Sequence, residues 1–259
     1  MSAERYLIIG FGVYGISAAL HLLEAKPAQL TILSHHQPQE PSDDISKIVR
    51  IDYTRVSRMK EAICAQECWR NDKRFTPFYQ PVGRIVAYDN KDISTLNNIN
   101  NARSELGKEK RNHLGKDILE NVFGSTNAPD GLTFVYNKDD GLVEWKGCMQ
   151  AMRDIIQNKK ATIREIPVQK LIHNGERITA VSLVNNERIE TEDMKIILAA
   201  GPWIMEILER SGIEQPPDSR APVATGIFAF ILQLSDDQRK VFQGKPGFSH
   251  IGHGMSKSA

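Results

Sequence analysis

The feature that most restricts the fold of this chain is a glycine pattern near its N-terminus. Residues 10–15 read Gly-Phe-Gly-Val-Tyr-Gly, which is the spacing G-x-G-x-x-G. The apolar run 6–9 before it predicts a strand buried on both faces, and the amphipathic segment 12–25 after it predicts a helix. A second apolar run follows at 30–33. Strand, glycine turn, helix and strand in this order predict a βαβ unit.

The three glycines have separate physical roles in such a turn. Gly10 permits the tight turn, Gly12 lets backbone N–H groups approach a pyrophosphate, and Gly15 allows close packing of helix on strand. The helix N-terminus adds partial positive charge for the phosphates, so Val13 and Tyr14 belong to the same predicted cofactor-binding set. The alternative is a glycine turn with a structural role alone.

The end of the second predicted strand departs from the usual dinucleotide pattern. An Asp or Glu that binds the adenosine ribose is expected there, but the residue is Ser34. A serine hydroxyl still forms a hydrogen bond, of about half the strength of a charge-assisted one. We therefore expect Ser34 to be a weaker ribose contact, and we expect His35 and His36 to be loop residues rather than ligands.

Further along, the sequence predicts a mixture of helices and strands. Residues 35–56 are polar and loop-like, the charged stretch 107–116 is expected to be solvated surface, and no element is expected after Gly247. The expected helices are 57–71, 92–106, 115–122 and 145–157. The expected strands are 82–88, 161–165, 194–199, 224–233 and a meander of 168–173, 177–184 and 187–190.

The composition restricts the partners and the compartment. A net charge of +1 provides no basis for binding nucleic acid or an anionic membrane, and no apolar run reaches 18 residues. The sequence shows no signal peptide, and its three cysteines indicate a reducing compartment. These features predict a cytoplasmic protein, with a peroxisomal address open for a longer form. We further expect a monomer that acts on a small molecule.

Beyond the glycine pattern, three segments resemble the sarcosine oxidase-like family of flavoproteins, which includes fructosyl-amino-acid, pipecolate and saccharopine oxidases. They are Asp-Asp-Ile-Ser-Lys-Ile-Val-Arg-Ile-Asp-Tyr at 43–53, Ile-Pro-Val at 166–168 and Ile-Leu-Ala-Ala-Gly-Pro-Trp at 197–203. The first segment looks most like the fungal saccharopine and fructosyl-amino-acid oxidases. The resemblance implies an FAD cofactor and oxidation of a secondary amine or N-substituted amino acid, with oxygen reduced to hydrogen peroxide.

The same resemblance assigns roles to individual residues. It implies that Lys47 lies against the flavin ring and that Arg50 binds the substrate carboxylate, so these two are the predicted catalytic residues. It also implies cofactor contacts at Ser46, Lys47, Val168, Ala200, Gly201 and Trp203. Independently of the family, a planar guanidinium matches a carboxylate and a lysine can stabilise a reduced flavin. The alternative is that Lys47 and Arg50 are surface charges paired with Asp43, Asp44 or Asp52.

No metal site is predicted. Cys64 and Cys68 lie one helical turn apart without further ligands, so we expect buried thiols, and we expect Cys148 in the core. His250 and His253 stand among glycines and are not expected to bind a metal.

The predicted fold class is α/β. It comprises a doubly wound, Rossmann-like FAD domain of the glutathione reductase type, with an interleaved α+β substrate domain that is incomplete at the C-terminus. The FAD domain is expected at 1–80 and 141–220, with helices on one side of its sheet and the meander on the other. The substrate domain is expected at 81–140 and 221–259. Two alternatives are an NAD(P)-dependent dehydrogenase and a truncated, catalytically incompetent FAD-binding fragment.

Overall fold

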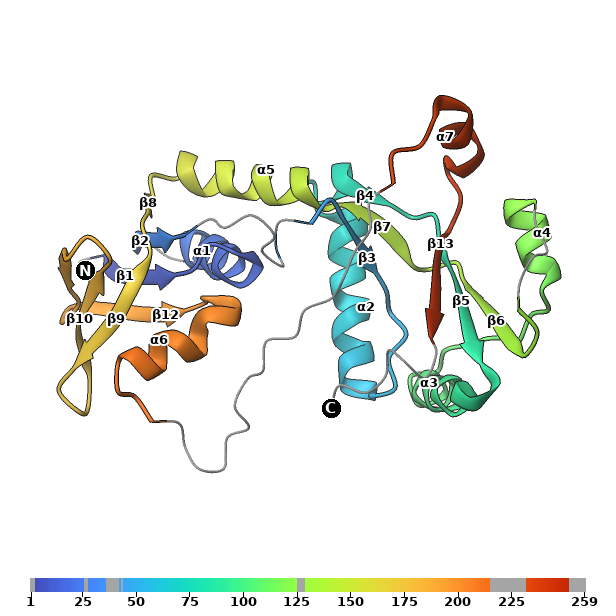
Figure 1. The fold of residues 1–259 in the computed structure, drawn as a ribbon, viewed down its shortest axis with the longest axis horizontal. Coiled ribbons are helices and arrows are strands. Elements are labelled where there is room, and N and C mark those ends of the chain that lie inside the picture. Colours follow the sequence, from blue (N-terminus) through green and yellow to red (C-terminus); the bar gives the residue numbers. More distant parts are fainter. Residues whose placement is uncertain are drawn as a thin grey trace. The chain divides into compact units, whose positions relative to one another are not determined.

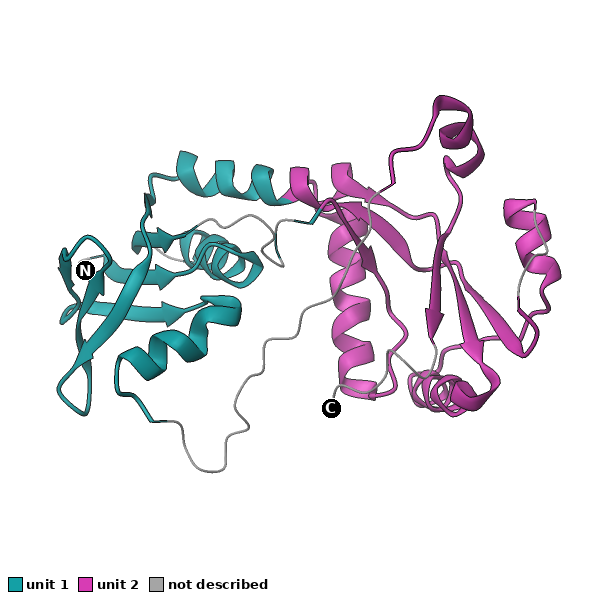
Figure 2. Cartoon of the chain, viewed as in Figure 1, with its two compact units in different colours: residues 1–44, 149–229 teal, residues 45–148, 230–259 magenta. Residues whose placement is uncertain are grey.

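The chain forms two compact units. The computed structural model describes residues 3–25, 28–35, 42, 44–124, 129–214 and 232–251. One unit comprises residues 1–44 and 149–229, and the other comprises 45–148 and 230–259 (Figure 2). The units thus interleave along the chain, with changes at 44/45 and 148/149 where the sequence placed them at 80/81 and 140/141. The assignment of one unit to FAD and the other to substrate stays a prediction.

The first unit is built on a four-stranded parallel sheet in the order β12-β1-β2-β8 (Figure 1). These strands are β1 Glu4–Ile9, β2 Ala28–Ser34, β8 Thr162–Glu165 and β12 Met194–Leu198. Helix α1, Val13–Ala25, connects β1 to β2 as parallel neighbours require. The predicted βαβ unit is confirmed, and with it the α/β fold class.

Alternation along β1 and β2 gives this sheet two different apolar faces. Leu7, Ile9 and Leu33 face a cluster that the antiparallel meander covers, together with Ile207 of α6, Ile204–Arg210. Ile8 faces α1. A Cβ atom placed on Gly15 of this helix would lie 3.5 Å from the Cγ2 atom of Ile8. The meander consists of β9 Val168–His173, β10 Ile178–Leu183 and β11 Arg188–Glu190. The prediction of helices on one side of the sheet and the meander on the other holds for α1 but is wrong for α6, which packs on the meander side.

The second unit contains two three-stranded sheets, ordered β13-β5-β6 and β3-β7-β4. Their strands are β3 Ser46–Val49, β4 Tyr79–Gln80, β5 Arg84–Asp89, β6 Leu132–Asn137, β7 Gly141–Glu144 and β13 Gly247–Ile251. The helices are α2 Val56–Asn71, α3 Ile93–Glu105, α4 Asp117–Phe123, α5 Trp145–Asn158, whose residues from 149 on belong to the first unit, and α7 Asp236–Phe242. Short 3-10 turns occupy Thr76–Phe78 and Asn90–Asp92 in this unit and Gly201–Trp203 in the first unit. The first four helices confirm the predicted ones to within two residues.

Two expectations for the second unit are wrong. Residues 46–49 lie in a stretch expected to be loop, yet they form β3 and pair antiparallel with β7, almost 100 residues away in the chain. Residues 247–251 were expected to form no element, yet they form β13 and pair in parallel with β5. Both strands are short, so neither gives a clear alternating pattern in the sequence, and pairing with β7 and β5 stabilises them.

One predicted strand cannot be compared with the structure over most of its length. Residues 224–231 of the predicted strand 224–233 lie outside the described residues, and 232–233 have no regular structure. Within the described ranges, no helix has both the length and the hydropathy needed to cross a bilayer.

Candidate functional site

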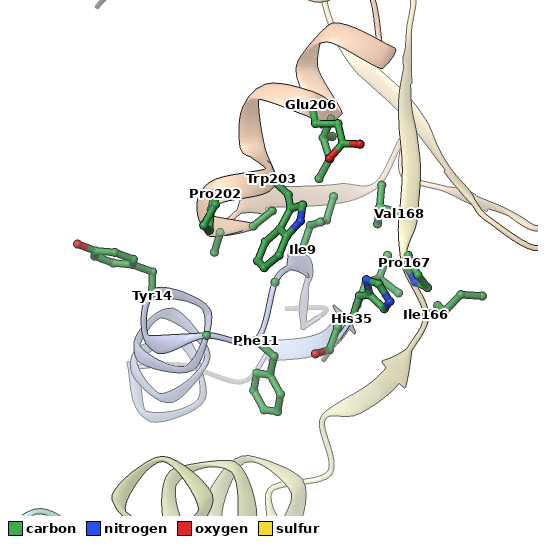
Figure 3. Close-up of a pocket in the computed structure, with 18 of the residues that line it drawn as sticks. Ile9, Phe11, Tyr14, His35, Ile166, Pro167, Val168, Pro202, Trp203 and Glu206 are labelled. Atoms are coloured by element: carbon green, nitrogen blue, oxygen red, sulfur yellow. The ribbon is translucent and has the colours of Figure 1, made fainter. Parts of the chain in front are cut away.

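A cavity of about 450 Å³ lies at the carboxyl ends of the parallel strands of the first unit. Ile9 ends β1, Ser34 ends β2 and Ala199 follows β12, and all three line the cavity (Figure 3). Ligands of open α/β sheets bind at this edge, because the loops after the strands converge there. The cavity therefore has the position expected of a nucleotide site.

The glycine loop forms one wall, and its backbone leaves no room for side chains at two positions. Gly10 has φ +106°, and a Cβ there would lie closer than 3.0 Å to the backbone oxygen of Ala199. A Cβ at Gly15 would lie closer than 3.0 Å to the backbone oxygen of Gly10. Both glycines thus permit close backbone approach, as the sequence predicts.

Gly12 differs from Gly10 and Gly15, because no described backbone atom lies close to the position of its missing side chain. Among the described residues, a Cβ at Gly12 would meet only the side chain of Ser42, with its Oγ 2.9 Å away. The same hydroxyl accepts a hydrogen bond of 3.1 Å from the backbone N–H of Val13, at the start of α1. A phosphate oxygen is another acceptor that the N–H groups at a helix N-terminus bind. The surroundings of Gly12 therefore fit a pyrophosphate that passes over the loop.

The facing wall comes from two segments that the sequence singled out. Ile166, Pro167 and Val168 lie where β8 passes into β9, and Ala200, Gly201 and Trp203 lie in the turn before α6. Figure 3 shows the Trp203 indole beside the glycine loop, whereas the Tyr14 ring points outward from α1. Tyr14 is 79% exposed, so its backbone amide is the part of it that faces the loop.

The structure brings together every predicted cofactor-binding residue of the first unit around this cavity, with one exception. The exception is Gly15, which supports the loop from behind. The lining residues that sequence reasoning missed are Phe11, His35, Ser42, Val184, Glu206 and Arg210. Glu206 and Arg210 form an ion pair one turn apart on α6. Ile207 of α6 also lines the cavity and was not predicted. Apart from Phe11, which lies within the glycine pattern, no local motif marks these residues, because the fold alone brings them to the sheet edge.

Ser46, Lys47 and Arg50 belong to the second unit, in and just after β3. Arg50 is exposed, and its guanidinium carbon lies 4.6 Å from the centre of the Tyr53 ring, a cation–π contact. Among the described residues, no carboxylate pairs with Arg50. The alternative pairing of Arg50 with Asp52 is therefore not found.

Asp52 instead lies in a buried ion cluster. Its carboxylate accepts hydrogen bonds from Arg103 at 2.6 Å, Arg111 at 2.9 Å and Asn137 at 2.9 Å. Asn137 also donates to Asp140 at 2.8 Å. These bonds fix the backbone directly after Arg50.

Asp140 extends the cluster. It pairs with Arg84 at 2.8 Å and accepts the Ile51 N–H at 3.2 Å. Burial raises the pKa of Asp140 above its usual range, and Arg84 opposes this shift. Arg111 corrects an expectation: it lies in the stretch 107–116 expected to be solvated, but its side chain is only 10% exposed.

The cysteines divide into two kinds. Cys148 is buried as expected, and burial together with the nearby Glu144 raises its pKa to about 11. Cys64 and Cys68 are exposed on α2, so the expectation of buried thiols is wrong for both. The helix has almost no amphipathic character, which explains why spacing alone misplaced them. In the described part of the chain, no group of three or more His, Cys, Asp or Glu could hold a metal ion.

Comparisons with known proteins identify the family of the chain. Residues 5–251 match the family described as FAD dependent oxidoreductase. The chain is 36% identical to L-saccharopine oxidase of Schizosaccharomyces pombe, over 94% of this chain and 59% of that protein. It is 22% identical to human peroxisomal sarcosine oxidase, over 83% of this chain and 56% of that protein.

The fold has close counterparts among solved structures. A modified fructosyl peptide oxidase from Aspergillus nidulans superposes with a TM-score of 0.75 at 18% identity, over 96% of this chain and 60% of that one. The chain thus spans about three fifths of the length of the relatives it matches. The family match confirms the predictions of an FAD cofactor and of an oxidoreductase: the chain belongs to the family of FAD-dependent oxidoreductases.

Proposed function

We propose that this protein takes part in oxidising the C–N bond of a secondary amine or N-substituted amino acid. The cavity over the glycine loop carries the proposal, because it fits a dinucleotide at the edge of the sheet where such folds bind one. The relatives support the substrate class. Saccharopine, sarcosine and fructosyl peptides, which the names of the relatives give, all carry a secondary amine next to a carbon that can be oxidised.

The cofactor would be held by groups of the first unit. The N–H groups at the start of α1 would bind the pyrophosphate, over the space that Gly12 leaves open. Val168, Ala200, Gly201 and Trp203 would cover the cofactor from the facing wall. When bound, FAD would supply the two-electron oxidation of the C–N bond to an imine, which water would hydrolyse, with oxygen as the final electron acceptor and hydrogen peroxide as its product.

The second unit would supply the charged groups for the substrate. Arg50 presents an exposed guanidinium with no carboxylate partner among the described residues, stacked on Tyr53 and followed by the anchored Asp52. It suits a bidentate pair with an amino-acid carboxylate. Lys47 is proposed to stabilise the negative charge of the reduced cofactor, and Ser46 to contact the cofactor beside it. The cytoplasmic location and the monomeric state stay predictions.

Replacing Arg50 with alanine is expected to weaken binding of an amino-acid ligand about tenfold to hundredfold, because a hydrogen bond to a charged group contributes about 1.5–3 kcal/mol. The ligand is titrated into the FAD-loaded chain, and the change in flavin absorbance is followed. N-methylglycine is compared with dimethylamine, which lacks the carboxylate. The parent should prefer N-methylglycine, and Arg50→Ala should lose the preference while it keeps FAD.

Arg55→Ala is the matched control, because Arg55 is also exposed and lies five residues away in the same unit. It should bind both ligands as the parent does. Loss of FAD with unchanged ligand affinity in Arg50→Ala would show that the role given to Arg50 is wrong.

A further inference from the structure

The last residue of β2 is a serine, where dinucleotide-binding folds usually have a carboxylate for the adenosine ribose. Ser34 is the last residue of β2 and lines the cavity. In such folds, an Asp or Glu near this point binds the ribose hydroxyls. The Ser34 side chain has no hydrogen-bond partner among the described residues, and a hydroxyl offers only a neutral bond. The charge that this site normally needs is therefore missing from β2.

A carboxylate stands on the adjacent strand at the same level. Ser34 and Glu165 are Cα partners in the parallel register of β2 and β8. Residues in register on neighbouring strands lie about 4.8 Å apart and direct their side chains to the same face. The three residues after Glu165, which are Ile166, Pro167 and Val168, all line the cavity. Glu165 thus directly precedes the segment that lines the cavity from Ile166 on, and it lies in register with Ser34, the position that lacks an acid.

The surroundings of Glu165 leave its carboxylate available. Glu165 is exposed, and no described residue pairs with it. The nearest cation along the chain, Arg164, is held by Glu187 through two hydrogen bonds of 2.7 and 2.6 Å. An exposed glutamate changes rotamer within nanoseconds, so it can turn toward a ligand without a rearrangement of the strand.

We propose that Glu165 is the acceptor for the hydroxyls of the adenosine ribose, in place of the acid that β2 lacks. The proposal rests on the proposed function, in which the cavity binds FAD. A glutamate on β8 reaches across to the ribose because its side chain is one methylene longer than that of aspartate. Ser34 then serves as a small neighbour that leaves room for this carboxylate.

The test is the dissociation constant of FAD, measured by titration with the parent chain and two variants. Glu165→Gln is expected to weaken FAD binding about tenfold or more, since it replaces a charge-assisted bond with a neutral one. Glu192→Gln makes the same change of charge in the same unit, at an exposed site just before β12 begins. This control lies at the opposite edge of the sheet and should leave the affinity unchanged.

A competition experiment shows whether the ribose is the group recognised. ADP and 2′,3′-dideoxy-ADP are used to displace FAD from each chain. The parent and Glu192→Gln should prefer ADP, Glu165→Gln should not, and Ser34→Asp in the Glu165→Gln chain should restore the preference.

Two results would overturn the proposal: unchanged FAD affinity in Glu165→Gln, or an equal loss for ADP and its dideoxy analogue. Absence of FAD binding by the parent would instead contradict the proposed function itself.

Discussion

Gly12→Val is expected to abolish FAD binding while the chain remains folded. The valine side chain would occupy the space through which the backbone N–H groups reach the pyrophosphate. In the described part of the chain it would displace only the side chain of Ser42, so we expect the fold itself to tolerate it. Flavin absorbance after gel filtration measures the first effect, and circular dichroism measures the second.

Gly10→Val and Gly15→Val provide the contrast. Their side chains would run into backbone oxygens, so these variants should lose stability as well as FAD. Val13→Ala keeps the backbone amide and should retain the cofactor. Equal flavin content in Gly12→Val and the parent would show that the pyrophosphate does not bind at this loop.

Asp52→Ala is expected to lower the free energy of unfolding of the second unit by about 3–5 kcal/mol, the usual cost of breaking a buried ion pair by removing one partner. Arg103 and Arg111, with side chains only 5% and 10% exposed, would both lose a carboxylate. Denaturation with urea measures the change. Tryptophan fluorescence reports on this unit, because Trp69 and Trp145 pack in one of its clusters.

Asp130→Ala is the control for Asp52→Ala. Asp130 is fully exposed and lies 3.8 Å from Lys116 in the same unit, and such surface pairs contribute about 0–1 kcal/mol. If Asp52→Ala and Asp130→Ala unfold at the same urea concentration, the cluster around Asp52 does not stabilise this unit.

The parts of the fold that could be predicted have local signals. The glycine loop, the buried strands β1 and β2, and the meander after β8 can each be recognised from a pattern of a few consecutive residues. Apolar runs, turn residues and periodicity act at this range, so they indicate both the element and its partner. The cavity wall formed by Gly10, Gly12 and Ser34 could be predicted for the same reason.

The parts that could not be predicted depend on partners far along the chain. Asp52 meets Arg111 and Asn137 from 59 and 85 residues away, and nothing near any of them indicates the contact. Strand β13 forms because β5 offers it an open edge. The proposed role of Glu165 depends on its register with Ser34 across β2 and β8, and the sequence alone does not indicate this pairing. The roles of Lys47 and Arg50 come from family resemblance and stay predictions.

The central claim is that this chain binds FAD in the cavity over the glycine loop. Isothermal titration of the purified 259-residue chain with FAD, and separately with NAD⁺, tests it most directly. We expect one FAD per chain, no comparable heat with NAD⁺, and loss of the FAD signal in Gly12→Val. Tighter binding of NAD⁺ than of FAD, or FAD binding that Gly12→Val leaves unchanged, would contradict the account.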